Sequence, residues 1–118
     1  MKNAAFFVRL GFAWSGIRTV WRRERSFRTQ VSLAALAVLA TAILRPGLIW
    51  CAAVALSIAL VLALEVLNSA LEAMIDHLHP DIAPAIKIAK DAAAGAVLIA
   101  SVAACCVGVC MVLSVVWR

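Results

Sequence analysis

The feature that most constrains this chain is a stretch from Ala92 to Trp117 that contains no charged residue. A helix that crosses the ~30 Å hydrocarbon core of a bilayer needs about 20 predominantly apolar residues. Leu48 to Leu64 is a second apolar stretch, and Val31 to Leu44 is a third that reaches spanning length when Phe27 to Gln30 are added at its start. The pattern therefore predicts three membrane-spanning helices.

The composition indicates that the chain is surrounded by lipid rather than water. Hydrophobic residues make up 66% of the 118 residues and charged residues only 14%, whereas soluble domains carry about 25% charged residues. We therefore expect a single all-α membrane domain covering residues 1–118. Its predicted segments are a surface helix at about 4–24 and transmembrane helices at about 28–45, 48–76 and 91–117.

The N-terminal segment predicts a helix that lies in the membrane interface. Its apolar side chains recur with the helical period on one face, and they are Phe6, Phe7, Leu10, Trp14, Ile17 and Trp21. The basic residues that flank this face are Lys2, Arg9, Arg18 and Arg22. Aromatic side chains at the acyl boundary, beside arginines at the headgroups, are typical of an interfacial amphipathic helix.

The basic residues predict the orientation of the chain in the membrane. Those that precede the first long apolar stretch are Lys2, Arg9, Arg18, Arg22, Arg23, Arg25 and Arg28. Lys87 and Lys90 lie between the second and third spans, and only Arg45 and Arg118 lie on the opposite side. Because basic residues mark the cytoplasmic side, the N-terminus and the second loop are expected there. The positive charge indicates contact with anionic lipid rather than nucleic acid.

Polar residues gather on one face at the end of the second span, spaced by three or four residues. They are Glu65, Asn68, Glu72 and Asp76. Glu65 would lie roughly 10 Å deeper than Glu72 at about 1.5 Å per residue, and an ionisable group inside a span usually marks function. Glu24 and the Lys90-Asp91 pair are expected at the same membrane level. Such carboxylates can hold a hard cation such as Mg²⁺ and serve phosphoryl transfer.

Four motifs resemble those of the prokaryotic diacylglycerol kinases, small membrane enzymes unrelated to soluble kinases. In chain order they are Trp14-x-Gly16-Ile17-Arg18, Glu24-x-x-Phe27-Arg28, the run Glu65-Val66-Leu67-Asn68-Ser69-Ala70-Leu71-Glu72-Ala73 with Asp76, and Ala89-Lys90-Asp91 followed by Gly95-Ala96-Val97-Leu98. The resemblance covers nearly the whole chain. It implies ATP-dependent phosphorylation of a membrane lipid alcohol, with diacylglycerol converted to phosphatidic acid as the first expectation.

The resemblance also implies an assembly and a set of site residues. We expect a homotrimer in the bacterial cytoplasmic (inner) membrane, with active sites between neighbouring subunits at the cytoplasmic interface, Mg²⁺ as cofactor and ATP as co-substrate. Glu65 would be the general base that acts on the lipid hydroxyl, and Glu24 and Glu72 would hold Mg²⁺. The implied ATP-binding residues are Glu24, Glu72, Asp76, Lys90 and Asp91, and the implied lipid-binding residues are Glu65, Asn68 and Ser69.

The chain departs from the enterobacterial pattern at a few positions. Thr29-Gln30 stands where those enzymes have Gln-Glu, so one outer carboxylate is missing, and Ala13 stands where they have Ser. The loop from His77 to Ile88 also differs. These departures affect the expected nucleotide contacts of the surface helix and the loop rather than the central carboxylates.

Three other functions remain open on the sequence alone. An undecaprenol kinase of the same family would use the same residues. A small proton-coupled transporter would use Glu65 as its proton carrier, although such exporters usually have four spans with the carboxylate in the first. A membrane scaffold would leave the polar face of the second span unexplained.

Overall fold

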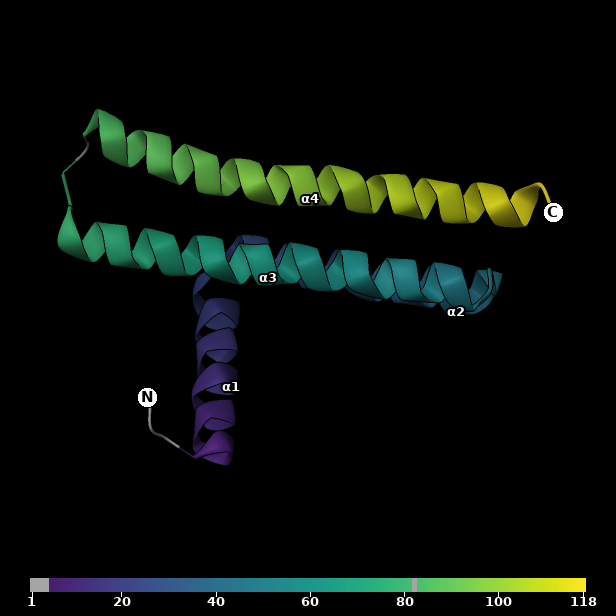
Figure 1. The fold of residues 1–118 in the computed structure, drawn as a ribbon, viewed down its shortest axis with the longest axis horizontal. Helices are drawn as coiled ribbons and strands as arrows, with labels where there is room; N and C mark the ends of the chain where they lie inside the picture. Colours follow the sequence, from purple (N-terminus) through teal and green to yellow (C-terminus); the bar gives the residue numbers. More distant parts are fainter. Residues whose placement is uncertain (1–4, 82) are drawn as a thin grey trace.

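The computed structural model describes residues 5–81 and 83–118, and it forms four helices. They are α1 (Phe6–Arg23), α2 (Arg25–Leu44), α3 (Leu48–Leu78) and α4 (Pro84–Val116). Figure 1 shows α3 and α4 side by side along the long axis of the molecule, with α1 roughly perpendicular to them and projecting on the side away from α4. By length and composition, α2, α3 and α4 can each cross a membrane. The predicted all-α fold with three apolar helices of spanning length is therefore confirmed.

The connection between α3 and α4 is shorter than the sequence suggested. The last helix begins at Pro84 rather than near residue 91. Proline favours the first turn of a helix because its fixed φ suits the helix and its missing N–H would have no partner there. Lys87 and Lys90 therefore lie on the helix rather than in the connection before it, and Asp91 lies about two turns into the helix rather than at its start.

The turn between α2 and α3 consists of Arg45, Pro46 and Gly47. Arg45 ends α2 in the left-handed region with φ 48°, and Gly47 has φ 109°, a conformation that side chains with a Cβ rarely adopt. The guanidinium of Arg118 donates to the carbonyl oxygen of Arg45 at 3.1 Å. The end of the chain thus satisfies a backbone acceptor that the end of α2 leaves open.

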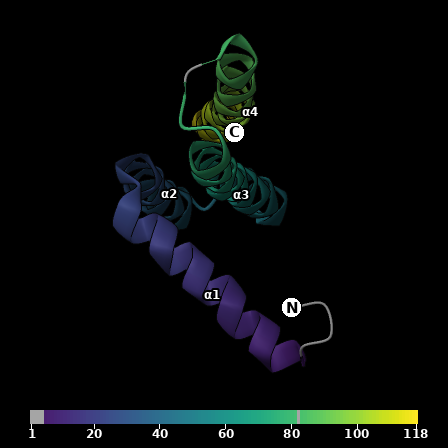
Figure 2. The same cartoon turned by 90° about the vertical axis from the view of Figure 1, so that its left-hand side faces the viewer.

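The helix α3 lies at the centre of the bundle, with α2 and α4 on its two sides (Figure 2). Few side chains are buried within one chain, and the apolar ones are Phe27, Val54, Val61, Ala100 and Met111. Every fourth residue of α4 from Ala96 to Gly108 is small; Ala100 is buried and the other three are half-buried, so this ridge lies on the packed side of the helix. Small side chains let two helices in lipid approach closely.

The helices differ in length, and this difference determines where the acidic residues of α3 lie relative to α2. At about 1.5 Å per residue, α2 is about 30 Å long, whereas α3 and α4 are about 46 Å and 50 Å. The hydroxyl of Ser26, in the first turn of α2, reaches Glu65 of α3. The remaining residues of α3, from Val66 to Leu78, therefore extend past the start of α2. This extension raises the outer carboxylates out of the region that α2 spans.

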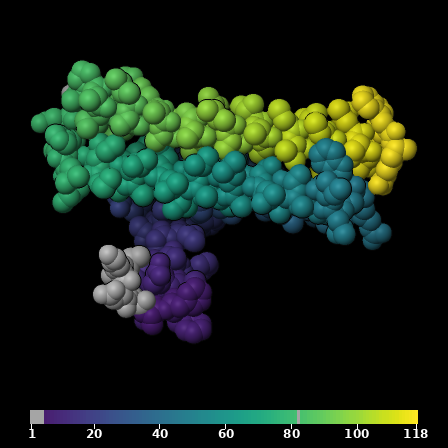
Figure 3. Space-filling model, viewed as in Figure 1, coloured from purple at the N-terminus to yellow at the C-terminus, as the bar shows by residue number. Residues whose placement is uncertain are grey.

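The junction of α1 and α2 is held by two contacts. The guanidinium of Arg28 donates to the carbonyl oxygens of Trp21 at 2.6 Å and Arg22 at 3.1 Å, which caps the last turn of α1. The ring of Phe27, only 4% exposed, meets the Trp21 ring edge-on with centroids 6.4 Å apart. No residue of α1 is buried, and Figure 3 shows the helix projecting from the side of the bundle. The two contacts therefore set its direction.

Replacing Arg28 by Met should loosen α1. The change keeps most of the aliphatic stem and removes the donors to the two carbonyls, so we expect faster amide hydrogen exchange in the last turn of α1. The matched control is Arg25→Met, because Arg25 is an exposed arginine of the same region. Equal exchange rates in the two variants would contradict the capping role.

Candidate active site

The carboxylate of Glu65 lies in the interior of the bundle, where it is 5% exposed. The hydroxyl of Ser26 donates to its Oε1 at 3.1 Å, and the amide Nε2 of Gln30 lies 3.5 Å from the same oxygen. A charge taken out of water is tolerated only when donors replace its hydration. Both donors come from α2 and reach Oε1, so within the described residues Oε2 is left for another partner.

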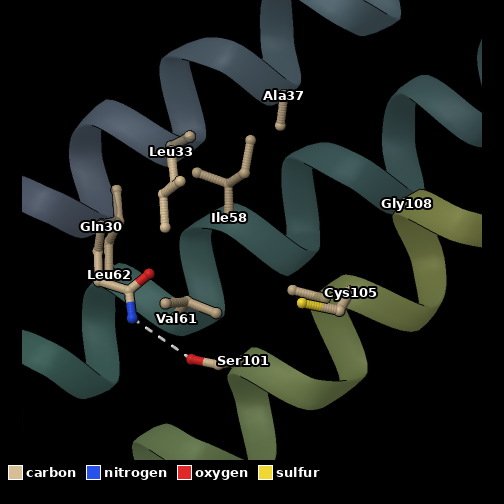
Figure 4. A pocket seen from close by; sticks show the side chains of 11 residues that line it. Gln30, Leu33, Ala37, Ile58, Val61, Leu62, Ser101, Cys105 and Gly108 are labelled. Atoms are coloured by element: carbon tan, nitrogen blue, oxygen red, sulfur yellow. Dashed lines mark hydrogen bonds between the residues drawn. The ribbon is translucent and has the colours of Figure 1, made fainter.

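The amide of Gln30 connects all three long helices. Besides facing Glu65 on α3, its Nε2 lies 3.4 Å from the hydroxyl oxygen of Ser101 on α4 (Figure 4). In the sequence Gln30 stands out only as a departure from the enterobacterial pattern, and no motif there marks Ser26 or Ser101 as site residues. The spacing of Ser26 and Gln30, one helical turn apart, is the signal that could have linked them to one face.

A cleft of about 340 Å³ lies between α1 and the outer part of α3. Its lining residues are Gly16, Thr19, Val20, Arg23, Glu24, Val66, Ser69, Ala70, Glu72, Ala73 and Asp76. The structure thus brings together three of the carboxylates that the sequence singled out, although one of them comes from the junction after α1. Ser69, which is buried, lines the same cleft.

Of the two site residues predicted on α4, Lys90 contacts a residue of the cleft and Asp91 does not. The ammonium of Lys90 donates to Asp76 at 2.5 Å, which connects α4 to the cleft. Asp91 instead pairs with Lys87 one turn away at 2.6 Å, where both side chains are mostly exposed, and it does not line the cleft. Exposed pairs of this kind contribute little to stability. Neither residue lines the cleft itself; within one chain Lys90 is tied to its rim through Asp76, and Asp91 is not.

The side chain of Asn68 lies between the deep carboxylate and the outer cleft along α3. Its Oδ1 is buried and has no hydrogen-bond partner in the part of the chain that the structure describes. Buried polar atoms are nearly always paired in folded proteins. The amide is therefore available to a ligand group that reaches this level.

The cleft offers oxygen ligands that suit Mg²⁺. Across residues 5–81 and 83–118, no group of three or more His, Cys, Asp or Glu side chains is arranged to hold a metal ion by itself. Glu24 and Glu72 line one cleft, and neither forms an ion pair within those residues. Because Mg²⁺ is usually held by one or two carboxylates together with substrate phosphates, this pair fits a cation that arrives with a nucleotide.

An apolar groove of about 400 Å³ runs along the bundle on the other side of Glu65. Its lining residues are Gln30, Leu33, Ala34, Ala37, Ile58, Val61, Leu62, Ser101, Ala104, Cys105 and Gly108 (Figure 4). Val61 lies one helical turn from Glu65 on the same face of α3. Glu65 itself lines neither cavity; along α3 it lies between the residues that line the apolar groove and those that line the acidic cleft.

A sequence pattern described as prokaryotic diacylglycerol kinase matches residues 11–112 of this chain. The chain belongs to the prokaryotic diacylglycerol kinase family. A protein of Synechocystis sp. named diacylglycerol kinase is 38% identical over 110 residues, which cover 90% of this chain and 61% of that relative. The diacylglycerol kinase of Escherichia coli is 34% identical over 106 residues, 86% of this chain and 87% of that protein.

The undecaprenol kinase of Bacillus subtilis is 33% identical over 103 residues, which cover 87% of this chain and 84% of that protein. The predicted family is thus confirmed, and these relatives support lipid kinase activity rather than a transporter or a scaffold. The roles assigned to individual residues remain predictions that rest on the geometry above.

Filling the cleft should hinder nucleotide binding without unfolding the chain. Ala73→Leu places extra side-chain volume among Glu24, Glu72 and Asp76, and we expect the KM for Mg-ATP to rise about tenfold, within the scale of overpacking penalties. The KM for lipid should change little. Ala63→Leu is the control because Ala63 is exposed on the same helix and lines neither the cleft nor the groove. Equal KM values for Mg-ATP in the two variants would contradict this use of the cleft.

Proposed function

We propose that the protein transfers the γ-phosphoryl group of ATP to the hydroxyl of diacylglycerol and forms phosphatidic acid. The observation that carries the proposal is the position of Glu65, a buried carboxylate between an apolar groove and a cleft lined by three acidic residues. A lipid alcohol and a nucleotide need those two environments on opposite sides of one base. The family and its named relatives support the same reaction.

The groove gives the hydrocarbon part of the substrate a place within the bundle. Its polar lining residues include Gln30 and Ser101 near Glu65, while the rest of its length toward Gly108 is mostly apolar. An acyl chain in the groove would place the glycerol hydroxyl at the level of Glu65. Asn68 and Ser69, the next polar residues along α3, are proposed to contact the lipid headgroup.

Glu65 is proposed to act as the general base. Its Oε1 is held by α2, and its Oε2 faces no protein donor within the described residues. This second oxygen takes the hydroxyl proton while the lipid oxygen bonds to the γ-phosphorus. The bond from that phosphorus to the bridging oxygen of ADP breaks, ADP leaves, and the proton is held on Glu65. A base must lie within hydrogen-bond reach of the proton that it removes.

The cleft is proposed to bind the nucleotide. Mg²⁺, when bound by Glu24 and Glu72, would neutralise charge on the β- and γ-phosphates. Lys90 lies at the edge of the cleft through Asp76, where its ammonium can attract a phosphate. Two alanines, Ala70 and Ala73, line the same cleft. Their small side chains leave room for phosphate groups beside the carboxylates.

We further propose a homotrimer in the cytoplasmic membrane, with the N-terminus on the cytoplasmic side and α1 in the interface plane. The exposed aromatic side chains and arginines of α1 support the interfacial position, although Lys2 lies outside the described residues. Asp91 lies apart from the cleft of its own chain and would serve that of a neighbour. Native mass spectrometry should then detect three copies of the 12.5 kDa chain.

The relative from Bacillus subtilis supports undecaprenol as a second candidate substrate. Its long isoprenoid chain also ends in a hydroxyl, and the apolar groove does not distinguish an isoprenoid from an acyl chain by its polar groups. Both lipids therefore belong in the same assay.

The direct test is phosphorylation of each lipid by the purified protein with Mg-ATP. Glu65→Gln should lower kcat by about 10²- to 10⁴-fold because it removes the general base and keeps the side-chain shape. Asp81→Asn is the matched control, since Asp81 is an exposed carboxylate in the loop after α3. A folded Glu65→Gln protein with a rate near that of the wild type would refute the role of Glu65.

A further inference from the structure

We propose that Gln30 and Ser101 are positioning residues that orient the carboxylate of Glu65, so that α4 fixes the base through α2. The inference rests on the proposed role of Glu65 and adds two residues that do not touch the reacting atoms. Glu65 is the general base, Gln30 contacts its carboxylate, and Ser101 influences that carboxylate only through Gln30.

The chemistry of the Gln30 amide fits this task. Its Nε2 carries two hydrogens, and that nitrogen lies 3.5 Å from Glu65 Oε1 and 3.4 Å from the hydroxyl oxygen of Ser101. One amide can therefore serve both acceptors at once. These separations are at the long end of the hydrogen-bond range, and catalytic contacts commonly shorten when substrate binds. A carboxylate at position 30 would supply no donor and would face Glu65 with a like charge.

Among the described residues, the Ser101 hydroxyl, like that of Ser26, takes part in hydrogen bonds only between helices, unlike five other hydroxyls of these helices. A hydroxyl inside a helix usually donates to the carbonyl of the preceding turn. Those that do so here are Thr19, Ser32, Thr41, Ser57 and Ser114. Within the described residues Ser101 makes no such bond and instead accepts from Gln30, a residue far from it in sequence. Its polar atom is used between helices rather than within one.

The arrangement also explains why the contact matters for the base. Among the described residues, side-chain hydrogen bonds link α2 and α4, or the residues that follow them, at three levels. These are Gln30 with Ser101, Thr41 with Met111, and Arg118 with the Arg45 carbonyl. Only the first of these reaches Glu65. Holding Oε1 from α2 directs Oε2 toward the remaining space, where the lipid hydroxyl must be.

The test compares two variants of nearly equal shape. Ser101→Thr keeps the hydroxyl, and Ser101→Val replaces it with a methyl group. We expect Ser101→Val to lower kcat about 2- to 10-fold, the scale of one hydrogen bond, with an unchanged KM for Mg-ATP, and Ser101→Thr to keep kcat near the wild-type value. In a Gln30→Leu background, Ser101→Val should cause no further loss, because partners in one network are not additive.

Three results would overturn the proposal. They are equal kcat values in Ser101→Thr and Ser101→Val, additive losses in the double variant, and an effect confined to the KM for lipid, which would make Ser101 a wall of the groove. The wild-type protein is assayed in parallel. If it phosphorylates neither lipid, the proposed function itself fails, whereas an active wild type with unaffected variants refutes only the positioning role.

Discussion

The placement of one carboxylate inside an apolar helix is the constraint on which the rest of the structure depends. A charged group at the depth of Glu65 is unfavourable unless hydrogen-bond donors replace water. The sequence supplies Ser26 and Gln30 one turn apart at the start of α2. The same contacts hold α2 against α3 and fix the level at which the shorter helix begins. Satisfying the buried charge and aligning the bundle are therefore one structural task.

This constraint also separates two environments along α3. Before Glu65 in the chain, the helix contributes Ile58, Val61 and Leu62 to the apolar groove. After Glu65, it contributes Ser69, Glu72 and Asp76 to the cleft. The extra length of α3 and α4 relative to α2 makes this possible, because the acidic residues extend past the apolar part of the bundle. Arg28 and Phe27 then place α1 beside that extension, which completes the cleft.

The sequence predicted the parts of this account that depend on periodicity and composition. Three long apolar stretches gave the three helices, and spacing of three and four residues placed Glu65, Asn68 and Glu72 on one face. It did not predict that α4 begins at Pro84, because a proline is equally typical of a loop and of the first turn of a helix.

The role of the serines in the bundle could not be read from sequence for a different reason. A serine in an apolar helix usually bonds to its own backbone, and nothing local distinguishes Ser57, which does so, from Ser101, which does not. Only the packing of α2 against α3 and α4 shows that Gln30 lies between Glu65 and Ser101. The pairing of Asp91 with Lys87 has another cause: the two residues are four apart, as in a helical ion pair, but the spacing indicates this only once the helix is known to begin at Pro84.

The most direct test of the central claim is to label the protein in vesicles with a lipid-soluble carbodiimide and locate the modified carboxylates by mass spectrometry. The lipid-soluble reagent should modify Glu65 from the hydrocarbon side, and more slowly when diacylglycerol fills the groove, whereas Glu24 and Glu72 should react with a water-soluble carbodiimide instead. If Glu65 reacts only with the water-soluble reagent, or if diacylglycerol does not protect it, the carboxylate does not lie at the boundary between lipid and nucleotide and the account is wrong.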